Sequence, residues 1–409
     1  MIDAAFGILN TCMLRRQWLG TAKQAVLAGL CSSKGKPDRR KFLSMGAPRI
    51  AAITAFALRI PFDHWAPSPA FAGRPRTTLD TVLVRVTTDG GTVGWGEAYG
   101  GFWSAVVPAI DQWVAPLAIG QKVDDVALPA RIERTLHNLG RAGATIHAIS
   151  GLDIALWDIR GKLAGVPVAT LLGGRRRDRI EVYASLLQYN GELERVRRIV
   201  DRALGEGFKQ IKLHERTADA VAAARDVAGP GVPLMVDTNC AWLPADAIDA
   251  VAEMAPSDLL WIEEPIWPPE DFASLAALRH ATGVATAIGE NASNALDFKK
   301  MLADDCVDYV QPSVIKIGGL TPLWRICTES EAAGTTCVPH SPFFGPGYLA
   351  TIQVLAAKAR ASALERFYCD LAFDPCGSFA PIADGFIDIP EGPGLGGDPD
   401  MDLIDRYRA

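Results

Sequence analysis

The chain has 409 residues, of which 49% are hydrophobic and 22% are charged, and its formal net charge is −6. These values are typical of a globular protein with one large α/β domain and one smaller domain. The chain contains neither a basic stripe nor a run of 18 apolar residues. We therefore expect no nucleic-acid partner and no membrane span.

Eight cysteines are spread along the chain without a C-x-x-C pair. Cys306, Cys327 and Cys337 lie in or beside expected barrel elements, where a thiol commonly packs as a small buried hydrophobe. This usage is typical of a reducing compartment, so we expect a cytoplasmic protein. We also expect it to be a homo-oligomer.

The first 46 residues are rich in Arg and Lys and contain no clear strand pattern. Residues 39–43 (RRKFL) resemble a twin-arginine export signal. However, the apolar run that follows, 50–58, is flanked by Arg49 and Arg59 and is needed as the first strand of the next domain. We therefore expect residues 1–46 to be a flexible leader, or translation to start at Met45.

Residues 47–170 have the pattern of a small α+β domain. Two alternating runs on either side of Asp89-Gly90-Gly91 predict a β-hairpin. Helical patterns follow, and the longest places Gly151 and Ala155 where a neighbouring element can pack closely. The expected segments are the strands 81–87 and 92–97 and the helices 105–118, 129–138 and 146–163.

Two loops of this domain, 63–76 and 100–103, are rich in Pro, Gly or aromatic residues. Long aromatic loops inside a compact domain are often lids over a site. Asp63 and His64 in the first loop suit a hydroxylated substrate. The aromatic residues that favour an apolar substrate instead are Trp65, Phe71, Phe102 and Trp103.

From residue 171 onward, short apolar runs alternate with amphipathic helical segments. This alternation predicts a barrel of parallel strands, in which the carboxyl ends of the strands converge on one mouth. The tail from residue 371 is rich in Gly and Pro, and we expect it to run back over the small domain. The expected strands are 181–187, 210–214, 233–239, 259–264, 284–290, 309–313, 336–340 and 363–368.

Three carboxylates follow successive apolar runs of this barrel. Asp237, Glu263 and Glu290 lie about 26 residues apart, each at the end of a short run rich in Val, Ile, Leu or Ala. Strands that repeat at this distance would bring the three side chains to the same mouth. Carboxylate oxygens are the ligands that hard divalent cations prefer. The pattern therefore predicts a metal site, most naturally for Mg²⁺.

Lys212 and His214 are two residues apart on an expected strand, so their side chains point to the same face, here the barrel interior. A lysine is seldom buried without a function. The histidine can act as a base near neutral pH, and we expect Lys212 to lower its pKa by repulsion between like charges. Lys212 could also hold a substrate carboxylate, and His214 could instead serve only as a hydrogen-bond partner of the substrate.

An ordered set of motifs resembles the enolase superfamily, and most closely its mandelate racemase-like branch. The resemblance implies a modified (β/α)7β TIM-type barrel in residues 171–370. It also implies an N-terminal α+β capping domain in residues 47–170, which the tail 371–409 completes. The motifs are ALWDIRGK (155–162), Lys212-x-His214, Asp237-x-Asn239, WIEEP (261–265), Gly289-Glu290-Asn291, KIGG (316–319) and VPHS with His340.

The resemblance also implies residue roles. It implies that Asp237, Glu263 and Glu290 bind Mg²⁺ and that a small-molecule carboxylate is the substrate. Glu264 follows Glu263 on the same strand and would face the opposite side. The residues with an implied catalytic role are Lys212, His214, His340 and Glu365, and those with an implied substrate-binding role are Lys212, Asn239 and Lys316. A barrel-rim salt bridge is the alternative role for Glu365.

One position departs from the family pattern. The mandelate racemase-like branch pairs its strand-7 histidine, here His340, with an aspartate ahead of the KIGG motif. Ser313 occupies that position in this chain. The muconate-lactonizing branch would have a lysine there, which is also missing. The expected partner of His340 is therefore a hydroxyl without charge.

Three functions are compatible with these residues. The first is an enzyme that removes the proton α to a carboxylate and eliminates water, as a dehydratase of acid sugars does. The second is a racemase, epimerase or cycloisomerase that uses His214 and His340 on opposite faces of one carbon. The third is a barrel that only binds a ligand, which the Ser313 replacement would favour. The presence of the other site residues of the family pattern argues against the third function. Because acid-sugar dehydratases dominate the branch that the chain resembles, we favour dehydration.

Overall fold

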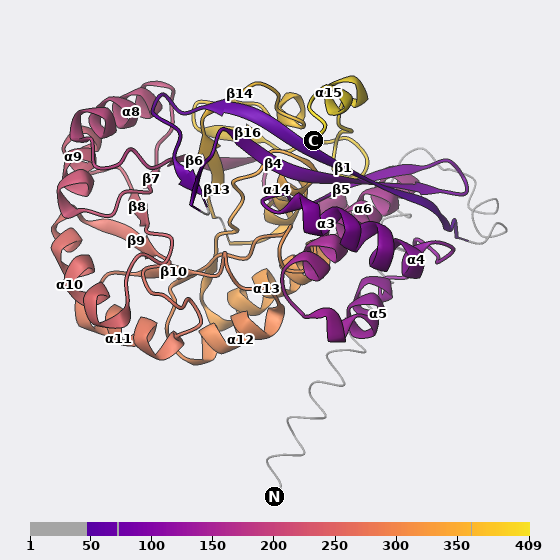
Figure 1. Ribbon diagram of the computed structural model, residues 1–409, viewed down its shortest axis with the longest axis horizontal. Helices are drawn as coiled ribbons and strands as arrows, with labels where there is room; N and C mark the ends of the chain where they lie inside the picture. Colours follow the sequence, from indigo (N-terminus) through magenta and orange to yellow (C-terminus); the bar gives the residue numbers. More distant parts are fainter. Residues whose placement is uncertain (1–46, 72, 361) are drawn as a thin grey trace, which may run out of the picture.

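The computed structural model describes residues 47–71, 73–360 and 362–409. The expected leader, 1–46, lies outside these residues. A barrel surrounded by helices occupies the left of Figure 1, and an antiparallel sheet with its own helices lies beside it on the right. In the described part of the chain, no helix has the length and apolar character that a membrane crossing requires.

The small domain is built on an antiparallel sheet in the order β14-β1-β4-β5. Strand β1 (Ile50–Asp63) pairs with β4 (Thr78–Thr88), which turns at Gly90-Gly91 into β5 (Val93–Tyr99), as the hairpin pattern predicts. One face of the sheet is covered by helices that bury Val, Ile, Leu and Ala side chains. The main covering helices are α3 (Trp103–Ala109), α5 (Leu128–Thr135) and α6 (Ala144–Ala164).

Helix α6 and strand β5 pack closely because both carry small residues at the contact. A Cβ atom on Gly96 would lie 1.9 Å from the carbonyl oxygen of Gly151, and one on Gly94 would lie 2.4 Å from that of Ala155. Both contacts are far below van der Waals distance, so only glycine fits in the strand. The small residues expected to allow close packing on this helix therefore do so against β5.

The barrel strands run parallel in the order β12-β11-β10-β9-β8-β7-β6, and β13 pairs in parallel with β6. Helices cover the outside, as Figure 1 shows for α8 to α13. The predicted barrel with a capping domain is confirmed. The strands are β6 (Arg179–Leu186), β7 (Ile211–Leu213), β8 (Leu234–Asp237), β9 (Leu259–Glu263), β10 (Thr286–Ile288), β11 (Tyr309–Val310), β12 (Thr336–Cys337) and β13 (Leu364–Tyr368). The helices are α8 (Leu193–Gly205), α9 (Ala218–Ala228), α10 (Pro244–Met254), α11 (Phe272–Thr282), α12 (Ala295–Ala303), α13 (Leu320–Ala333) and α14 (Pro346–Ala357).

Several barrel strands end earlier than the sequence pattern indicates. Strand β8 ends at Asp237, because Asn239 adopts a left-handed backbone with φ of 50°. Strand β10 ends at Ile288, and Gly289 follows with φ of 134°. These turns place the polar residues at the mouth of the barrel instead of within its strands.

The C-terminal segment returns to the small domain. Strand β14 (Asp370–Leu371) pairs with the end of β1, and the backbone nitrogen of Arg59 donates to the carbonyl of Tyr407 at 3.0 Å. Ile404 of helix α15 (Met401–Arg406) packs in the small-domain cluster that contains Leu58 and Trp95. The tail thus adds both backbone pairing and apolar contacts to the sheet.

Glu97 links the two domains at the edge of the barrel. Its side chain is fully buried, accepts hydrogen bonds from the Thr81 hydroxyl at 2.6 Å and from the Gly347 amide at 2.9 Å, and lies at the amino end of α14. Burial raises its pKa from 4.5 to about 7, although these hydrogen bonds act in the opposite direction. Ionised Glu97 is therefore stabilised less by the fold than neutral Glu97.

The wild type should lose stability as pH increases and Glu97 ionises, and replacing Glu97 with Gln should remove this loss. The raised pKa means that the wild type loses stability as pH increases from about 4.5 to about 7, whereas an amide keeps the same charge throughout. The free energy of unfolding of Glu97→Gln, relative to wild type, should improve by about 3 kcal/mol across this window. Urea unfolding at pH 5 and pH 8 measures it, with the exposed Glu253→Gln as the control. A difference between Glu97→Gln and wild type that does not change with pH would contradict the prediction.

Candidate active site

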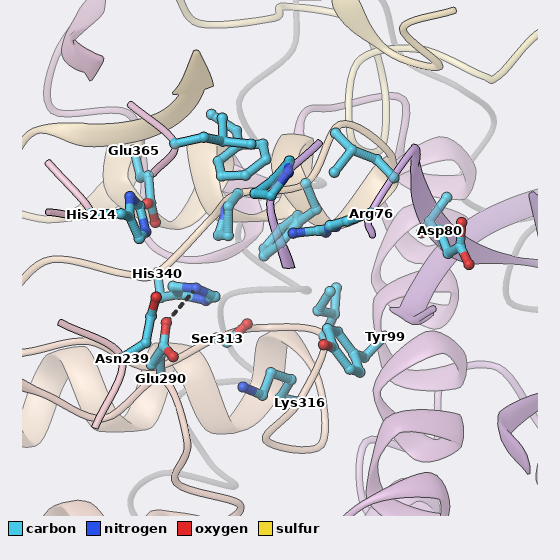
Figure 2. Close-up of a pocket in the computed structure, with 18 of the residues that line it drawn as sticks. Arg76, Asp80, Tyr99, His214, Asn239, Glu290, Ser313, Lys316, His340 and Glu365 are labelled. Atoms are coloured by element: carbon cyan, nitrogen blue, oxygen red, sulfur yellow. Dashed lines mark ion pairs between the residues drawn. The ribbon is translucent and has the colours of Figure 1, made fainter. Parts of the chain in front are cut away.

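A cavity of about 580 Å³ opens at the carboxyl ends of the barrel strands, beside the small domain. Figure 2 shows its barrel residues on the left and its small-domain residues on the right. The barrel residues discussed below are His214, Asn239, Glu290, Ser313, Lys316, His340, Phe367 and Glu365. The small-domain residues include Pro69, Ala70, Arg76, Leu79, Asp80, Glu97 and Tyr99.

The three predicted metal-binding carboxylates lie together at this mouth. Asp237 ends β8, Glu263 ends β9, and Glu290 follows the end of β10. One oxygen from each lies within 4.8 Å of the others. Three buried carboxylate oxygens at this separation fit a hard divalent cation such as Mg²⁺. Among the described residues the structure thus brings the predicted set together, and its role as a ligand set stays a prediction.

The electrostatics of this cluster favour an added positive charge. Burial raises the pKa of Glu263 well above its usual value even though Lys212 is adjacent. For Glu290, burial acts in the same direction, but His340, Lys316 and Lys212 together lower the pKa by more. Lys212 alone therefore does not supply enough positive charge to keep Glu263 ionised. A further cation would be needed for all three buried carboxylates to be ionised together.

Lys212 is fully buried and contacts three carboxylates. Its Nζ lies 2.8 Å from Glu263, 2.8 Å from Glu365 and 3.5 Å from Asp237. Burial lowers its pKa, but these carboxylates, with Glu263 first, raise the pKa well above the usual value. Lys212 is thus a permanent cation at the base of the site.

His214 points to the same side as Lys212, in agreement with their spacing. Its Nε2 lies 3.2 Å from Asp237, and its Nδ1 contacts the carbonyl of Leu186. Lys212 lowers the pKa of His214, as expected, but the net pKa of this histidine lies above its usual value. Burial lowers this pKa and Lys212 adds to the decrease, but the charge and hydrogen bond of Asp237 raise it by more. The sequence did not reveal that Asp237, on the neighbouring strand, lies within contact distance of the His214 ring.

His340 contacts the carboxylate cluster from the other side. Its Nε2 lies 2.7 Å from Glu290, which Figure 2 marks with a dashed line. Its buried Nδ1 has no hydrogen-bond partner within the described ranges, and the same holds for the buried hydroxyl of Ser313. In the mandelate racemase-like branch, an aspartate at the position of Ser313 pairs with the histidine. Ser313 does not form the corresponding hydrogen bond with His340 in this structure.

Glu365 is engaged on both oxygens. One lies 2.8 Å from Lys212, and the other accepts a hydrogen bond from the amide of Ser341 at 2.9 Å. The Ser341 contact holds the segment directly after His340. Glu365 is thus buried between the strand that carries Lys212 and the loop that carries His340, and is not a salt bridge at the exposed rim.

Glu264 turns away from the cluster, as its position after Glu263 predicts. Its carboxylate accepts from the amide of Gly289 at 2.9 Å and contacts the Cys240 thiol at 3.7 Å. Burial, reinforced by Glu290, raises its pKa to about 8. Glu264 fixes the loop before Glu290, which is a positioning role.

Asn239 and Lys316, the other two predicted substrate-binding residues, line the cavity. The amide of Asn239 donates to Asp237 at 2.9 Å, so it is oriented by a predicted metal-binding residue. The Nζ of Lys316 lies 5.5 Å from the ring centroid of Tyr99 in the small domain. Both side chains are positioned to contact a molecule bound beside the acidic cluster.

Gln311 is a site residue that our sequence analysis missed. It is fully buried and its amide donates to Glu263 at 2.7 Å, while the Trp261 indole donates to the same carboxylate oxygen at 3.1 Å. Gln311 lies two positions before Ser313, directly after β11. The period of two along a strand would have placed it on the interior face and could have revealed it.

The expectation that Asp63 and His64 of the first lid loop face a hydroxylated substrate is wrong. His64 is buried and stacks on Tyr189, with ring centroids 5.8 Å apart, and Asp63 accepts from the amide of Trp65 at 2.7 Å. Neither Asp63 nor His64 lines the cavity. The loop contributes Pro69, Ala70 and Arg76 instead, because a short hairpin between β2 (Ala70–Phe71) and β3 (Arg74–Pro75) directs it back to the mouth.

The comparisons with known proteins agree with this fold and site. Residues 195–403 match the family described as enolase C-terminal domain-like, and residues 62–173 match the N-terminal domain of mandelate racemase / muconate lactonizing enzyme. The chain therefore belongs to the mandelate racemase/muconate lactonizing enzyme family of the enolase superfamily, as the sequence motifs indicated.

Individual relatives are similar over most of their length. The chain is 32% identical to a D-galactarolactone cycloisomerase from Agrobacterium fabrum, over 80% of this chain and 91% of the relative. It is 28% identical to a D-xylonate dehydratase from Haloferax volcanii, over 80% of this chain and 85% of the relative. A solved structure of a racemase from Streptomyces coelicolor with bound magnesium matches with a TM-score of 0.79 and 26% identity, over 88% of this chain and all (100%) of that one.

Proposed function

We propose that this protein removes the α-proton of a sugar-acid carboxylate in a Mg²⁺-dependent reaction, and that the usual outcome is loss of water from the neighbouring carbon. The observation that carries the proposal is the juxtaposition of three carboxylates with candidate bases on two sides. His214 contacts Asp237, and His340 contacts Glu290. Mandelate racemase-family membership and dehydratase-named relatives such as that from Haloferax volcanii support it.

The metal would be held by Asp237, Glu263 and Glu290. When bound, Mg²⁺ supplies positive charge that stabilises an α-carbanion as an enediolate. Lys212, Asn239 and Lys316 would bind and orient the substrate carboxylate. Glu365 would hold Lys212 in place, since its carboxylate lies 2.8 Å from the Nζ atom.

The two histidines would move protons at the reacting carbons. A base takes the proton from the α-carbon, and the electron pair of that C–H bond forms the enediolate. In dehydration, the C–O bond at the β-carbon then breaks, and protonated His340 gives its proton to the departing hydroxyl, which leaves as water. His214 is the base in this scheme, because it contacts Asp237 beside Lys212. Lys212 would hold the substrate carboxylate, and the α-carbon is attached directly to that carboxylate.

Cycloisomerisation or racemisation is the second candidate. It uses the same α-proton chemistry but returns a proton to carbon or opens or closes a ring instead of releasing water. The cycloisomerase from Agrobacterium fabrum, at 32% identity, favours it. The two outcomes differ in the product: dehydration yields a 2-keto acid, whereas isomerisation yields a compound of unchanged composition.

Single substitutions of the histidines should separate the steps. In heavy water with Mg²⁺ and a panel of sugar acids, the wild type should exchange the α-proton and form a 2-keto acid. His214→Asn should lose both activities by about 10²-fold or more, whereas His340→Asn should retain exchange and lose product formation. Nuclear magnetic resonance of substrate and product measures both. Full turnover by His340→Asn would contradict its role, and absence of exchange with every sugar acid would contradict the proposed function.

Some expectations from the sequence remain proposals. We infer that the chain divides into a leader (1–46), a capping domain (47–170, completed by 371–409) and a barrel domain (171–370). We also infer that it acts as a homo-oligomer in the cytoplasm. Light scattering of the purified protein tests the assembly, and cell fractionation tests the location.

A further inference from the structure

The cavity extends beyond the acidic cluster to the small domain, where Arg76 faces it. Figure 2 shows its side chain directed from the small domain toward the barrel residues, on the side of the cavity away from His214 and Asn239. The guanidinium carbon lies 5.6 Å from the ring centroid of Phe367 at the end of β13. A cation therefore lines the distal half of the cavity, in addition to Lys316 beside the acidic cluster.

The backbone around Arg76 is well defined by its neighbours. Its amide donates to the carbonyl of Pro69 at 2.8 Å, which closes the β2–β3 hairpin, and strand β4 begins two residues later at Thr78. Arg76 is thus held between a hairpin and a strand of the sheet. A side chain on such a base can recognise a ligand at a defined position.

The two acidic residues in this part of the cavity already have partners. Asp80 accepts from the Thr78 hydroxyl at 2.6 Å and lies 3.6 Å from Arg59, and Glu97 is bound by Thr81 and Gly347. The walls near Arg76 include the apolar Ala70 and Leu79. In such surroundings, a charged hydrogen bond is stronger than in water. Burial lowers the pKa of Arg76 by more than Tyr99 and Asp80 raise it, so a bound anion would stabilise the guanidinium.

We propose that Arg76 binds a second carboxylate of the substrate, so that the preferred substrates are sugar diacids and not monoacids. This inference rests on the proposed function, in which the first carboxylate lies at the acidic cluster. A guanidinium presents paired N–H donors that match a carboxylate, and it offers less to a hydroxymethyl group, which has a single oxygen and no charge. Arg76 would then select between molecules that differ only at the end remote from the reacting carbon.

The test uses pairs of sugar acids that differ only in the oxidation of the last carbon: galactarate with galactonate, glucarate with gluconate, and mannarate with mannonate. Both kcat/KM and the Kd from calorimetry are measured with Mg²⁺. In at least one pair, the wild type should prefer the diacid by about tenfold or more. Arg76→Gln should lower the diacid values by about tenfold to a hundredfold, mainly through KM and Kd, and leave the monoacid values within about twofold.

Two further variants sharpen the test. Arg74→Gln removes a charge from the same hairpin at an exposed position that does not line the cavity, and it should behave as wild type. Arg76→Lys keeps the charge without the paired donors and should restore part of the diacid preference. Thermal unfolding of each variant shows whether it is folded.

Either of two results would overturn the inference: no diacid preference in any pair, or an equal loss on both members of a pair in Arg76→Gln. These results differ from failure of the proposed function. If monoacids exchange their α-proton without dependence on Arg76, only the diacid inference fails. If diacids bind through Arg76 but no acid exchanges its α-proton, only the proposed function fails.

Discussion

Glu263→Gln is expected to abolish turnover, with a decrease in kcat of about 10³-fold or more, and to weaken Mg²⁺ binding. The amide keeps the size of the side chain but removes one of the three negative charges that would balance the cation. It also disturbs a fully buried network, because Glu263 accepts hydrogen bonds from Lys212 at 2.8 Å and from Gln311 at 2.7 Å. Calorimetric titration with Mg²⁺ and steady-state kinetics measure the two effects.

The adjacent Glu264→Gln is the matched control. It makes the same chemical change one residue away, where the carboxylate contacts the Gly289 amide and the Cys240 thiol instead of the acidic cluster. An amide oxygen can still accept the hydrogen bond from Gly289, so Mg²⁺ affinity should decrease by less than in Glu263→Gln. If Glu264→Gln weakens Mg²⁺ binding more, Glu263 is not the ligand of this pair.

Lys212→Met is expected to lower both stability and turnover. The substitution keeps much of the volume but leaves Asp237, Glu263 and Glu365 buried without the cation that contacts all three. Removing one partner of a buried ion pair typically costs about 3–5 kcal/mol. Because the pKa of Lys212 is raised, its stabilising contribution is fully present below about pH 10 and is lost only at higher pH.

Urea unfolding at pH 7.5 in the presence of a chelator measures the loss of stability, and the same experiment with Mg²⁺ should recover part of it, because Asp237 and Glu263 are predicted ligands. Turnover should decrease by about 10³-fold, since the substrate carboxylate also loses its cation. Lys316→Met is the control for stability: Lys316 lines the cavity and is partly exposed, so its replacement should cost less than about 1 kcal/mol. Equal costs for the two lysines would contradict the prediction.

Much of this architecture follows from local patterns in the sequence. Alternating strands and helices predicted the barrel, and an apolar run before each of Asp237, Glu263 and Glu290 predicted their convergence, because parallel strands end at one mouth. The period of two along a strand placed Lys212 and His214 on one face. Such features depend only on residues close together in the chain.

Contacts between distant segments decided the rest. Asp237 on the next strand raises the pKa of His214, and the first lid loop lines the cavity with Pro69, Ala70 and Arg76 instead of His64. The Ser313 hydroxyl has no hydrogen-bond partner among the described residues, which its place in the motif did not indicate. A loop without periodic side-chain pattern takes its path from the surfaces it packs against, and a pKa depends on charges within a few ångströms whatever their separation in sequence. The sequence therefore determined the barrel and the convergence of its three carboxylates, whereas only the tertiary structure decided the charges around His214 and which side chains close the distal end of the cavity.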